Sequence, residues 1–571
     1  MDKGRLLSLN ISQVLLALDM LFFSNPNYLN LVYISINIFL LLLSGTFLFI
    51  SNLYNISKYF YWIIIAEYIV IPFVYVEYGG LNLGLSLSLE VILFIIYYGL
   101  LLLGYLLNYL SEAILLVFFV FNMLFLRPAR FGTDELAIDY LSAGVFLSGH
   151  NPYNPITTSN LYQVIRDFSP YFFGTPLTTG GYVTWLGYPS LSFLFEIPAR
   201  FFRFSPTYTL VFFYFMTVFV YYVFLKRKKM LPIFNALIPG IMVNINNLNY
   251  PAGGIDDIVW VFFVSLSLFV NSERLKGIFY GLAVSYKQTP LALLPFYLIY
   301  LYKEKRNIKN FILYGILSFM ITNGYFILLS PSLYFSAVLS PITSPLIGIG
   351  FGPSIFSFNG MFYIERNFFT ISMIIIAISE IILFIVTYPK FRNRWSSFPY
   401  FIFLLEYRVL WNYIMYWSWL GFAQESDIKE IKFNSIRNHI INSKTIIVAT
   451  LIILFSLGML YHYNYVGYTD DFHVNVIKFS NSEIILNVSY DPSNGNLPTF
   501  VYPQFRLFIN KVMITANGYI WNYTAKPLYE GKWEIIELKS PFPIFDIPNY
   551  TQVELQVYYG DMLSVYYLYL N

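Results

Sequence analysis

The sequence predicts a polytopic α-helical membrane protein of about 13–15 transmembrane helices with an exterior C-terminal β-sandwich domain. Of its 571 residues, 57% are hydrophobic and only 11% are charged, and the mean hydropathy is +0.61. Soluble domains average about 25% charged residues, so an ordinary soluble enzyme is excluded. Apolar runs of helix length recur along most of the chain, and the last hundred or so residues change to an alternating pattern.

The apolar runs define the expected membrane crossings, since a hydrocarbon core of ~30 Å needs ~20 apolar residues per helix. We expect crossings at roughly 6–23, 28–52, 59–78, 85–109, 112–127, 207–225, 231–248, 257–271, 276–289, 290–302, 310–330, 367–388, 397–409, 411–423 and 444–463. Basic clusters such as Lys226–Lys229 orient the chain, because Lys and Arg favour the cytoplasmic side. The prediction is a multi-pass protein of the cell membrane with a cytoplasmic N-terminus and an exterior C-terminal domain.

These crossings divide the chain into three parts. Residues 1–111 form the N-terminal transmembrane helices, residues 112–463 a second transmembrane region, and residues 464–571 the exterior domain. Within the second part, the exterior loop 128–206 is too long for a simple connection. Its segments Asp134–Ser148 and Leu191–Phe202 have apolar residues at helical spacing, which predicts helices lying along the outer membrane surface.

The final 100 or so residues have the period of two that is typical of half-buried strands. Four segments alternate in this way: Phe472–Phe479, Glu483–Tyr490, Trp533–Leu538 and Gln552–Tyr558. Turn signals such as Pro492-Ser-Asn-Gly separate them, which favours a small β-sandwich. Three Asn-x-Ser/Thr sequons fit an exterior domain: Asn487, Asn522 and Asn549.

Composition limits the chemistry and the partners. The net charge of +3 is too small to indicate a nucleic-acid partner, so membrane lipid is the expected surface partner. The absence of cysteine excludes disulfides, thiolate metal sites and cysteine nucleophiles.

An acidic segment, Gly132–Tyr153, is the most informative stretch for function. Asp134 and Glu135 follow a predicted crossing and open an exterior helix, and Asp139 lies on the same helical face four residues after Glu135. Carboxylates at a membrane surface need a reason, because burial raises their pKa and costs free energy. The alternative interpretation is structural: Thr133 or Asp134 caps the helix, and the acidic first turn complements its dipole.

Three further segments follow in order: Tyr188-Pro-Ser-Leu191, Ala283–Pro290 with Lys287, and Tyr407–Tyr413 with Arg408. Together with the acidic motif and its turn Gly149-His-Asn-Pro-Tyr153, they resemble the GT-C superfamily of membrane glycosyltransferases over roughly residues 110–425. The likeness is nearest to the branch that uses polyprenol-phosphate-linked mannose. That branch has an acidic motif in its first large exterior loop, a Tyr-Pro-Pro-Leu-like element, and a Lys near a Pro in a later span.

The chain departs from this family pattern in three places. Ser190 stands where the family element has its second proline. Four predicted crossings precede the one that leads into the acidic loop, where the family usually has one. The C-terminal β domain is not a universal part of the family, and this leaves the acceptor open.

The resemblance implies an inverting glycosyltransferase that moves a hexose such as mannose from a polyprenyl-phosphate carrier to a hydroxyl of a glycan, glycolipid or glycoprotein. Asp134 is then the first candidate for the base that takes the hydroxyl proton. Glu135 either shares that role, orients the acceptor, or holds a divalent cation, and Asp139 supports the pair. No cofactor is required by the sequence itself, and the divalent cation remains open.

Lys287 and Arg408 are the candidates for the lipid-phosphate site, because a developing phosphate charge needs nearby cations. The alternatives are snorkelling to the membrane interface, or a buried ion pair such as Arg408 with Glu406. His150, Tyr153 and Tyr188 are candidate sugar contacts. Their structural alternatives are a turn histidine and aromatic anchoring at the membrane surface.

Asp256 and Asp257 follow the Asn-rich loop 244–254 at the outer end of a predicted crossing. They fit a metal site shared with Asp134, but we favour a polar loop in which one of them caps the next helix.

Other functions fit the same crossings. An oligosaccharyltransferase or glycan polymerase would share the fold and move a whole glycan. A lipid-linked-sugar transporter or flippase predicts inverted repeats with broken helices, and no repeat is evident. A membrane anchor that displays the β domain would leave the acidic segment without a role.

Overall fold

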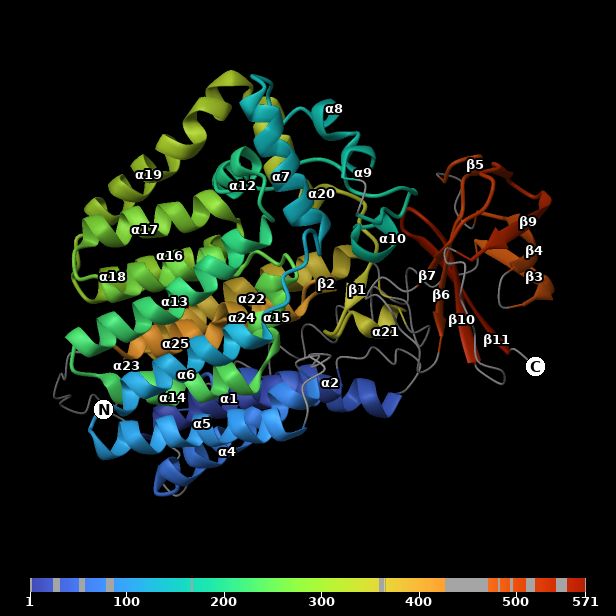
Figure 1. Ribbon diagram of the computed structural model, residues 1–571. Coiled ribbons are helices and arrows are strands. Elements are labelled where there is room, and N and C mark those ends of the chain that lie inside the picture. The colour runs from blue at the N-terminus through green and yellow to red at the C-terminus, as the bar shows by residue number, and fades with distance from the viewer. Residues whose placement is uncertain are drawn as a thin grey trace.

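The computed structural model describes residues 3–23, 31–50, 57–78, 87–165, 168–358, 364, 366–426, 471–480, 483–492, 497–509, 519–540 and 552–569. A helical region is followed by an all-β region, as the sequence predicts. The N-terminus lies at one end of the helical region and the β strands lie beyond the other end (Figure 1). The predicted crossing 444–463 and the sequon at Asn549 lie outside the described residues.

Five described helices are long and apolar enough to cross a membrane: α1 (Lys3–Phe22), α4 (Phe60–Tyr78), α13 (Thr207–Arg227), α19 (Ile308–Leu329) and α22 (Arg366–Val386). A sixth crossing is formed if α14 (Leu231–Val243) and α15 (Asn246–Ala252), bent by 70°, are one broken span. Four shorter apolar helices accompany them: α2 (Leu31–Phe47), α5 (Leu87–Leu106), α6 (Leu110–Phe125) and α16 (Ile258–Phe269). The chain is therefore a multi-pass membrane protein.

Several predicted crossings are too short to span a bilayer. The helices α17 (Glu273–Tyr286) and α18 (Leu294–Lys303) have 14 and 10 residues, or about 21 and 15 Å at ~1.5 Å per residue. The two crossings expected at 397–409 and 411–423 are wrong. The chain there forms four short pieces: α24 (Pro399–Leu404), β2 (Arg408–Val409), a 3₁₀ turn (Trp411–Tyr413) and α25 (Trp417–Glu425).

The physical reason is that hydropathy reports burial of a side chain and does not say whether protein or lipid buries it. All nine residues of α25 are buried inside the protein. Apolar runs of 10–14 residues are more often buried or re-entrant helices than full crossings.

The loop 128–206, which we expect to be exterior, contains α7 (Asp134–Leu147), which begins where its sequence predicts and ends one residue earlier. Thr133 caps it, because its side chain accepts a hydrogen bond from the Leu136 backbone N–H at 3.2 Å. Nine of the first ten residues of α7 are buried inside the protein, so this part of the helix packs within the fold. The remaining loop helices are short: α8 (Pro155–Thr158), α9 (Leu161–Val164), α10 (Pro170–Phe173), α11 (Leu191–Leu194) and α12 (Ile197–Phe202).

After α19, the chain forms α20 (Pro331–Thr343), β1 (Ile349–Gly350) and α21 (Ile355–Phe358). Between α22 and α24 lie α23 (Tyr388–Phe391) and a 3₁₀ turn (Trp395–Ser397). Another 3₁₀ turn (Thr289–Leu293) joins α17 to α18.

The β region is a sandwich of two antiparallel sheets. One sheet has the order β11-β10-β6-β7, formed by Met562–Tyr569, Gln552–Tyr559, Gln504–Ile509 and Tyr519–Trp521. The other has the order β3-β4-β9, formed by Phe472–Phe479, Glu483–Tyr490 and Trp533–Lys539, and a small sheet pairs β5 (Phe500–Val501) with β8 (Leu528–Tyr529). Inward-facing residues of both sheets, such as Leu486 and Leu555, share one core. All four strands expected from the alternating pattern are confirmed.

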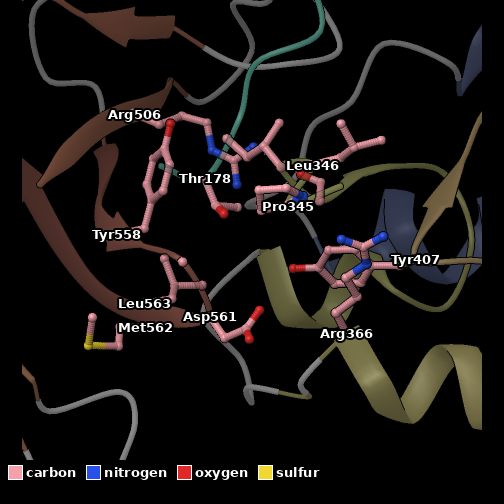
Figure 2. A pocket seen from close by; sticks show the side chains of 13 residues that line it. Thr178, Pro345, Leu346, Arg366, Tyr407, Arg506, Tyr558, Asp561, Met562 and Leu563 are labelled. Atoms are coloured by element: carbon pink, nitrogen blue, oxygen red, sulfur yellow. Dashed lines mark hydrogen bonds between the residues drawn. The ribbon is translucent and has the colours of Figure 1, made fainter. Parts of the chain in front are cut away.

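The β region packs directly on the helical region. Ile347 and Ile349 pack against Tyr558 and Leu563 of the β sandwich. Arg506 is buried in the sandwich and donates a hydrogen bond from Nη1 to the Gly348 carbonyl at 3.0 Å. Figure 2 shows this seam, with Arg506 and Tyr558 on one side and Arg366 and Tyr407 on the other. Its cavity of about 30 Å³ is large enough only for water, so the two regions meet closely.

Candidate functional site

A close approach of two glycine-containing segments assembles the site. A Cβ atom on Gly132 would lie 1.7 Å from the Gly253 carbonyl oxygen, so only glycine fits there. Beside it, Thr133 Oγ1 donates a hydrogen bond to the Gly254 carbonyl at 2.7 Å. The acidic start of α7 and the Asp256–Asp257 pair, which precedes α16, therefore lie next to one another.

Three carboxylates converge on one buried lysine. Lys287 Nζ lies 2.6 Å from Glu135 Oε1, 2.6 Å from Asp256 Oδ1 and 3.0 Å from Asp257 Oδ2. Asp256 and Asp257 are fully buried, and Lys287 is 3% exposed. Such a cluster is stable only because each charge has partners, since an unpaired buried charge is very costly. We call these four residues the Lys287 cluster.

Polar side chains outside the cluster hold Asp257 in place. Asn412 Nδ2 donates to Asp257 Oδ2 at 2.5 Å, and Trp260 Nε1 donates to Asp257 Oδ1 at 2.7 Å. Asn412 belongs to the segment 397–423, which consists of short elements instead of a helix long enough to cross a membrane. This segment therefore contributes a polar side chain to the site.

A cavity of about 420 Å³ opens beside the Lys287 cluster. This volume lies within the ~300–1,000 Å³ typical of small-molecule sites. Its wall carries charged, polar and aromatic groups: Asp134, Glu135, Trp185, Tyr188, Glu406, Arg408, Asn412 and Tyr413. The start of α7, the segment 172–188, the end of α20 and the segment 406–413 all contribute to this wall.

Asp134 lies at the cavity wall, and no cation of the described residues lies within ion-pair distance of it, although the charge of Arg408 lowers its pKa slightly. Its Oδ2 accepts a hydrogen bond from the Thr175 backbone N–H at 2.7 Å, and its Oδ1 accepts from the Glu135 N–H at 3.0 Å. Burial raises the pKa of Asp134 to about 6, against the lowering effect of the bonds from Thr175. A carboxylate of this pKa is ionised at neutral pH and still basic enough to take a proton.

Glu135 has the opposite electrostatic balance. Burial alone would raise its pKa, but the charge of Lys287 and hydrogen bonds with Asp256, Lys287 and Tyr188 together outweigh burial, so the pKa of Glu135 lies below its ordinary value. A carboxylate held by a lysine is a weaker proton acceptor than its unpaired neighbour. Asp134 and Glu135 are adjacent in sequence, and their different partners give them pKa values shifted in opposite directions.

Arg408 lies on the same cavity wall as Asp134. Its Nη1 donates to the Ile347 carbonyl at 2.5 Å, and the parallel pairing of Ile349 with Arg408 between β1 and β2 fixes its backbone. Within the described part of the chain, no carboxylate forms an ion pair with it, so the predicted Arg408–Glu406 pair is not formed. An unpaired guanidinium facing a cavity is suited to bind an anion.

Lys287 does not line the cavity, contrary to our expectation that it faces the lipid phosphate. It lies behind Glu135, and Tyr188 places its ring 5.1 Å from Nζ. Three carboxylates already neutralise its charge, so its direct role is to hold the acidic cluster together.

The other predicted site residues have different surroundings. Tyr188 lines the cavity, and Trp185 lies on the same wall. Asp139 is buried away from it, where burial raises its pKa well above the ordinary value and Ser192 donates to it at 2.7 Å. Tyr153 is buried and donates to the Tyr188 carbonyl at 3.1 Å, so it supports the wall from behind. His150 is exposed at the far end of α7, where it contacts Ser148 at 3.2 Å.

Sequence reasoning assigned Asp256 and Asp257 to a helix-capping loop, and this is wrong for their side chains. Asp257 occupies the capping position of α16 but makes no side-chain cap hydrogen bond. Both carboxylates instead bind Lys287. The signal available in the sequence was the pair Gly253-Gly254, one residue before the two acids, which permits close backbone approach.

In the described ranges, no group of three or more His, Cys, Asp or Glu side chains is arranged to hold a metal ion. The three clustered carboxylates are directed at Lys287 Nζ, and Asp134 stands apart from them. No protein-family model, curated protein or solved structure matches this chain.

Proposed function

We propose that the chain is an inverting glycosyltransferase that uses a polyprenyl-phosphate sugar and works at the cavity described above. The observation that supports this most strongly is that Asp134 and Arg408 line one cavity of about 420 Å³. A proton acceptor and an anion-binding group on one wall are the two groups that the reaction needs.

The reaction is a displacement at the anomeric carbon of the donor sugar. The acceptor hydroxyl oxygen forms a bond to that carbon while the carbon–oxygen bond to the phosphate breaks. The bonding pair leaves with the phosphate oxygen, and the hydroxyl proton moves to the Asp134 carboxylate. Removing such a general base typically costs ~10²–10⁴-fold in rate.

Arg408 binds the phosphate that leaves, because its guanidinium is always charged and has no carboxylate partner within the described residues. Tyr188 and Trp185 provide aromatic faces in the same cavity, suited to the donor sugar. The Lys287 cluster keeps Glu135 and the start of α7 in place.

The proposed donor is a lipid, so the site belongs beside the membrane. We assign it to the outer face of the cell membrane, with the N-terminus in the cytoplasm and the β region outside. The acceptor is a glycan, glycolipid or glycoprotein, and the transferred sugar is a hexose such as mannose.

The test uses the purified full chain in lipid nanodiscs, a polyprenyl-phosphate sugar with a radiolabelled hexose, and a crude glycan acceptor pool. We expect transfer of label by the wild-type protein and a loss of about 10²–10⁴-fold in D134N. Asn retains an acceptor oxygen for Thr175, so D134N is expected to fold. D491N, in an exposed part of the β region, is the matched control and should transfer normally. Normal transfer by D134N would refute the assignment of the base.

A further inference from the structure

A second cavity, of about 200 Å³, lies where the exterior loop meets the β sandwich. We call it the seam groove. The loop residues 176–182 form one wall, and strands β6, β7 and β10 with the segment after β7 form the other. Its volume is below the ~300–1,000 Å³ of sites for drug-sized ligands, so it suits a group the size of a single sugar ring or slightly larger.

The lining of the seam groove is aromatic and amide-bearing, and none of its described lining residues is charged. Its chemically distinctive side chains are Tyr182, Gln504, Trp521, Asn522, Tyr523 and Tyr558. A neutral sugar has an apolar C–H face and a rim of hydroxyl groups. Aromatic faces match the first, and side-chain amides, which both donate and accept hydrogen bonds, match the second.

An unsatisfied polar group adds to this picture. The hydroxyl of Tyr523 is buried and has no hydrogen-bond partner in the described part of the protein. Leaving a buried hydroxyl unpaired costs free energy, and a ligand hydroxyl that reaches it would recover that cost.

The loop that forms the groove also contacts the proposed base. The Thr175 backbone N–H donates to Asp134 at 2.7 Å, and the next residue, Pro176, lines the seam groove. A bridge between Pro176 and Tyr182 closes the loop on itself. One stretch of chain, 174–183, therefore has the catalytic cavity on one side and the seam groove on the other.

Two glycines bring this loop against the sandwich. Gly180 and Gly181 have φ of +94° and +77°, and a Cβ on Gly180 would lie 2.9 Å from the Gln504 amide nitrogen. Tyr558, which lines the groove, also lies at the closely packed contact between the β region and the helical region that Figure 2 shows. The seam groove is thus a preformed space of fixed shape.

We propose that the seam groove binds a neutral saccharide, a sugar unit of the acceptor that lies on the other side of the loop 174–183 from the reacting hydroxyl at Asp134. The acceptor role rests on the proposed function, whereas saccharide binding does not. The β region is then part of the acceptor site of this protein.

One rival occupant is a glycan attached to this chain. Asn522 begins the sequon Asn-Tyr-Thr, is exposed, and donates a hydrogen bond from Nδ2 to the Tyr171 hydroxyl at 2.6 Å. The test therefore uses full chain produced in a host without N-glycosylation, so that Asn522 is unmodified.

Binding is measured by saturation-transfer NMR with mannobiose, cellobiose and N,N′-diacetylchitobiose as probes. We expect at least one probe to bind the wild-type protein. We expect Y182A and Q504M to weaken its affinity about tenfold, which corresponds to the loss of one or two good contacts. Y529A is the matched control, because Tyr529 is 48% exposed and does not line the groove. Only variants that melt at the same temperature as the wild type are compared. Methionine has nearly the same shape as glutamine, so Q504M still tests the groove if Y182A does not fold.

The proposal is overturned if no probe binds, or if binding is the same in Q504M and Y182A as in the wild type. It is also overturned if the unmodified chain binds no probe while chain from a glycosylating host carries a glycan on Asn522. If the protein binds a saccharide in the seam groove but transfers no sugar from the lipid donor, the binding site stands and the proposed function is refuted. If the groove variants transfer sugar with the wild-type KM for the acceptor, the proposed function stands and the acceptor role of the groove is refuted.

Discussion

Replacing Lys287 with methionine removes the cation that three buried carboxyl groups share. The lysine nitrogen lies 2.6, 2.6 and 3.0 Å from oxygens of Glu135, Asp256 and Asp257. Methionine fills a similar volume, so the main change is electrostatic. Removing one partner of a buried ion pair typically costs ~3–5 kcal/mol. We expect K287M to lose at least that much, because three buried carboxyl groups lose the cation that they share.

The measurement is thermal unfolding in nanodiscs, followed by tryptophan fluorescence. K303M, at an exposed position in the last turn of α18, is the matched control and should melt like the wild type. The double variant K287M/D256N should recover part of the loss, because it replaces one of the carboxyl groups left without Lys287 by an amide that cannot ionise. A K287M protein as stable as the wild type would show that Lys287 does not hold the cluster together.

Three further variants test the surroundings of the site. R408Q should weaken the binding of polyprenyl phosphate by about 10- to 100-fold, which corresponds to the loss of one charged hydrogen bond. R274Q, at an exposed position, is the control and should bind it like the wild type. Equal affinity of R408Q and the wild type in a binding assay would argue against the anion site. N412L should lower the free energy of unfolding by about 1–3 kcal/mol, because Asp257 loses its 2.5 Å donor, and an unchanged melting curve would contradict this. S190P should destabilise more than S190A, since Ser190 donates to Asn323 Oδ1 from both its backbone N (2.8 Å) and its Oγ (2.9 Å), and proline removes both donors.

The chain's overall architecture was predictable because each part has a strong local signal. The alternating residues of β4 and β10 predicted their strands, and the long apolar run Arg366–Val386 predicted α22. The N-terminus of α7 was predictable from Thr133 and the two acids that follow it. The short elements of the segment 397–423 could not be predicted, because hydropathy does not distinguish apolar residues that are buried by protein, as in α25, from those that face lipid.

The site was predictable only in part. Asp134 and Arg408 could be identified because charges beside apolar segments are rare and need a reason. Their sharing of one cavity could not, because residues 134 and 408 are brought together only by the tertiary fold. The partners of Lys287 were missed for the same reason, since three ion pairs link this residue, which follows α17, to two other segments distant in sequence. The seam groove depends on the docking of the β sandwich, for which the sequence has no local signal.

The central claim is that the Asp134 carboxylate takes the acceptor proton, and the pH dependence of kcat/KM for transfer tests it most directly. Because burial raises the pKa of Asp134 to about 6, the carboxylate is ionised above that pH and protonated below it. We therefore predict that kcat/KM reaches a plateau above about pH 7 and falls about tenfold per pH unit well below 6. D134N should have low activity at every pH, whereas D491N should follow the wild-type curve. A rate that stays constant from pH 5 to 7.5 in the wild type, or a D134N protein with wild-type kcat/KM, would contradict this role of Asp134.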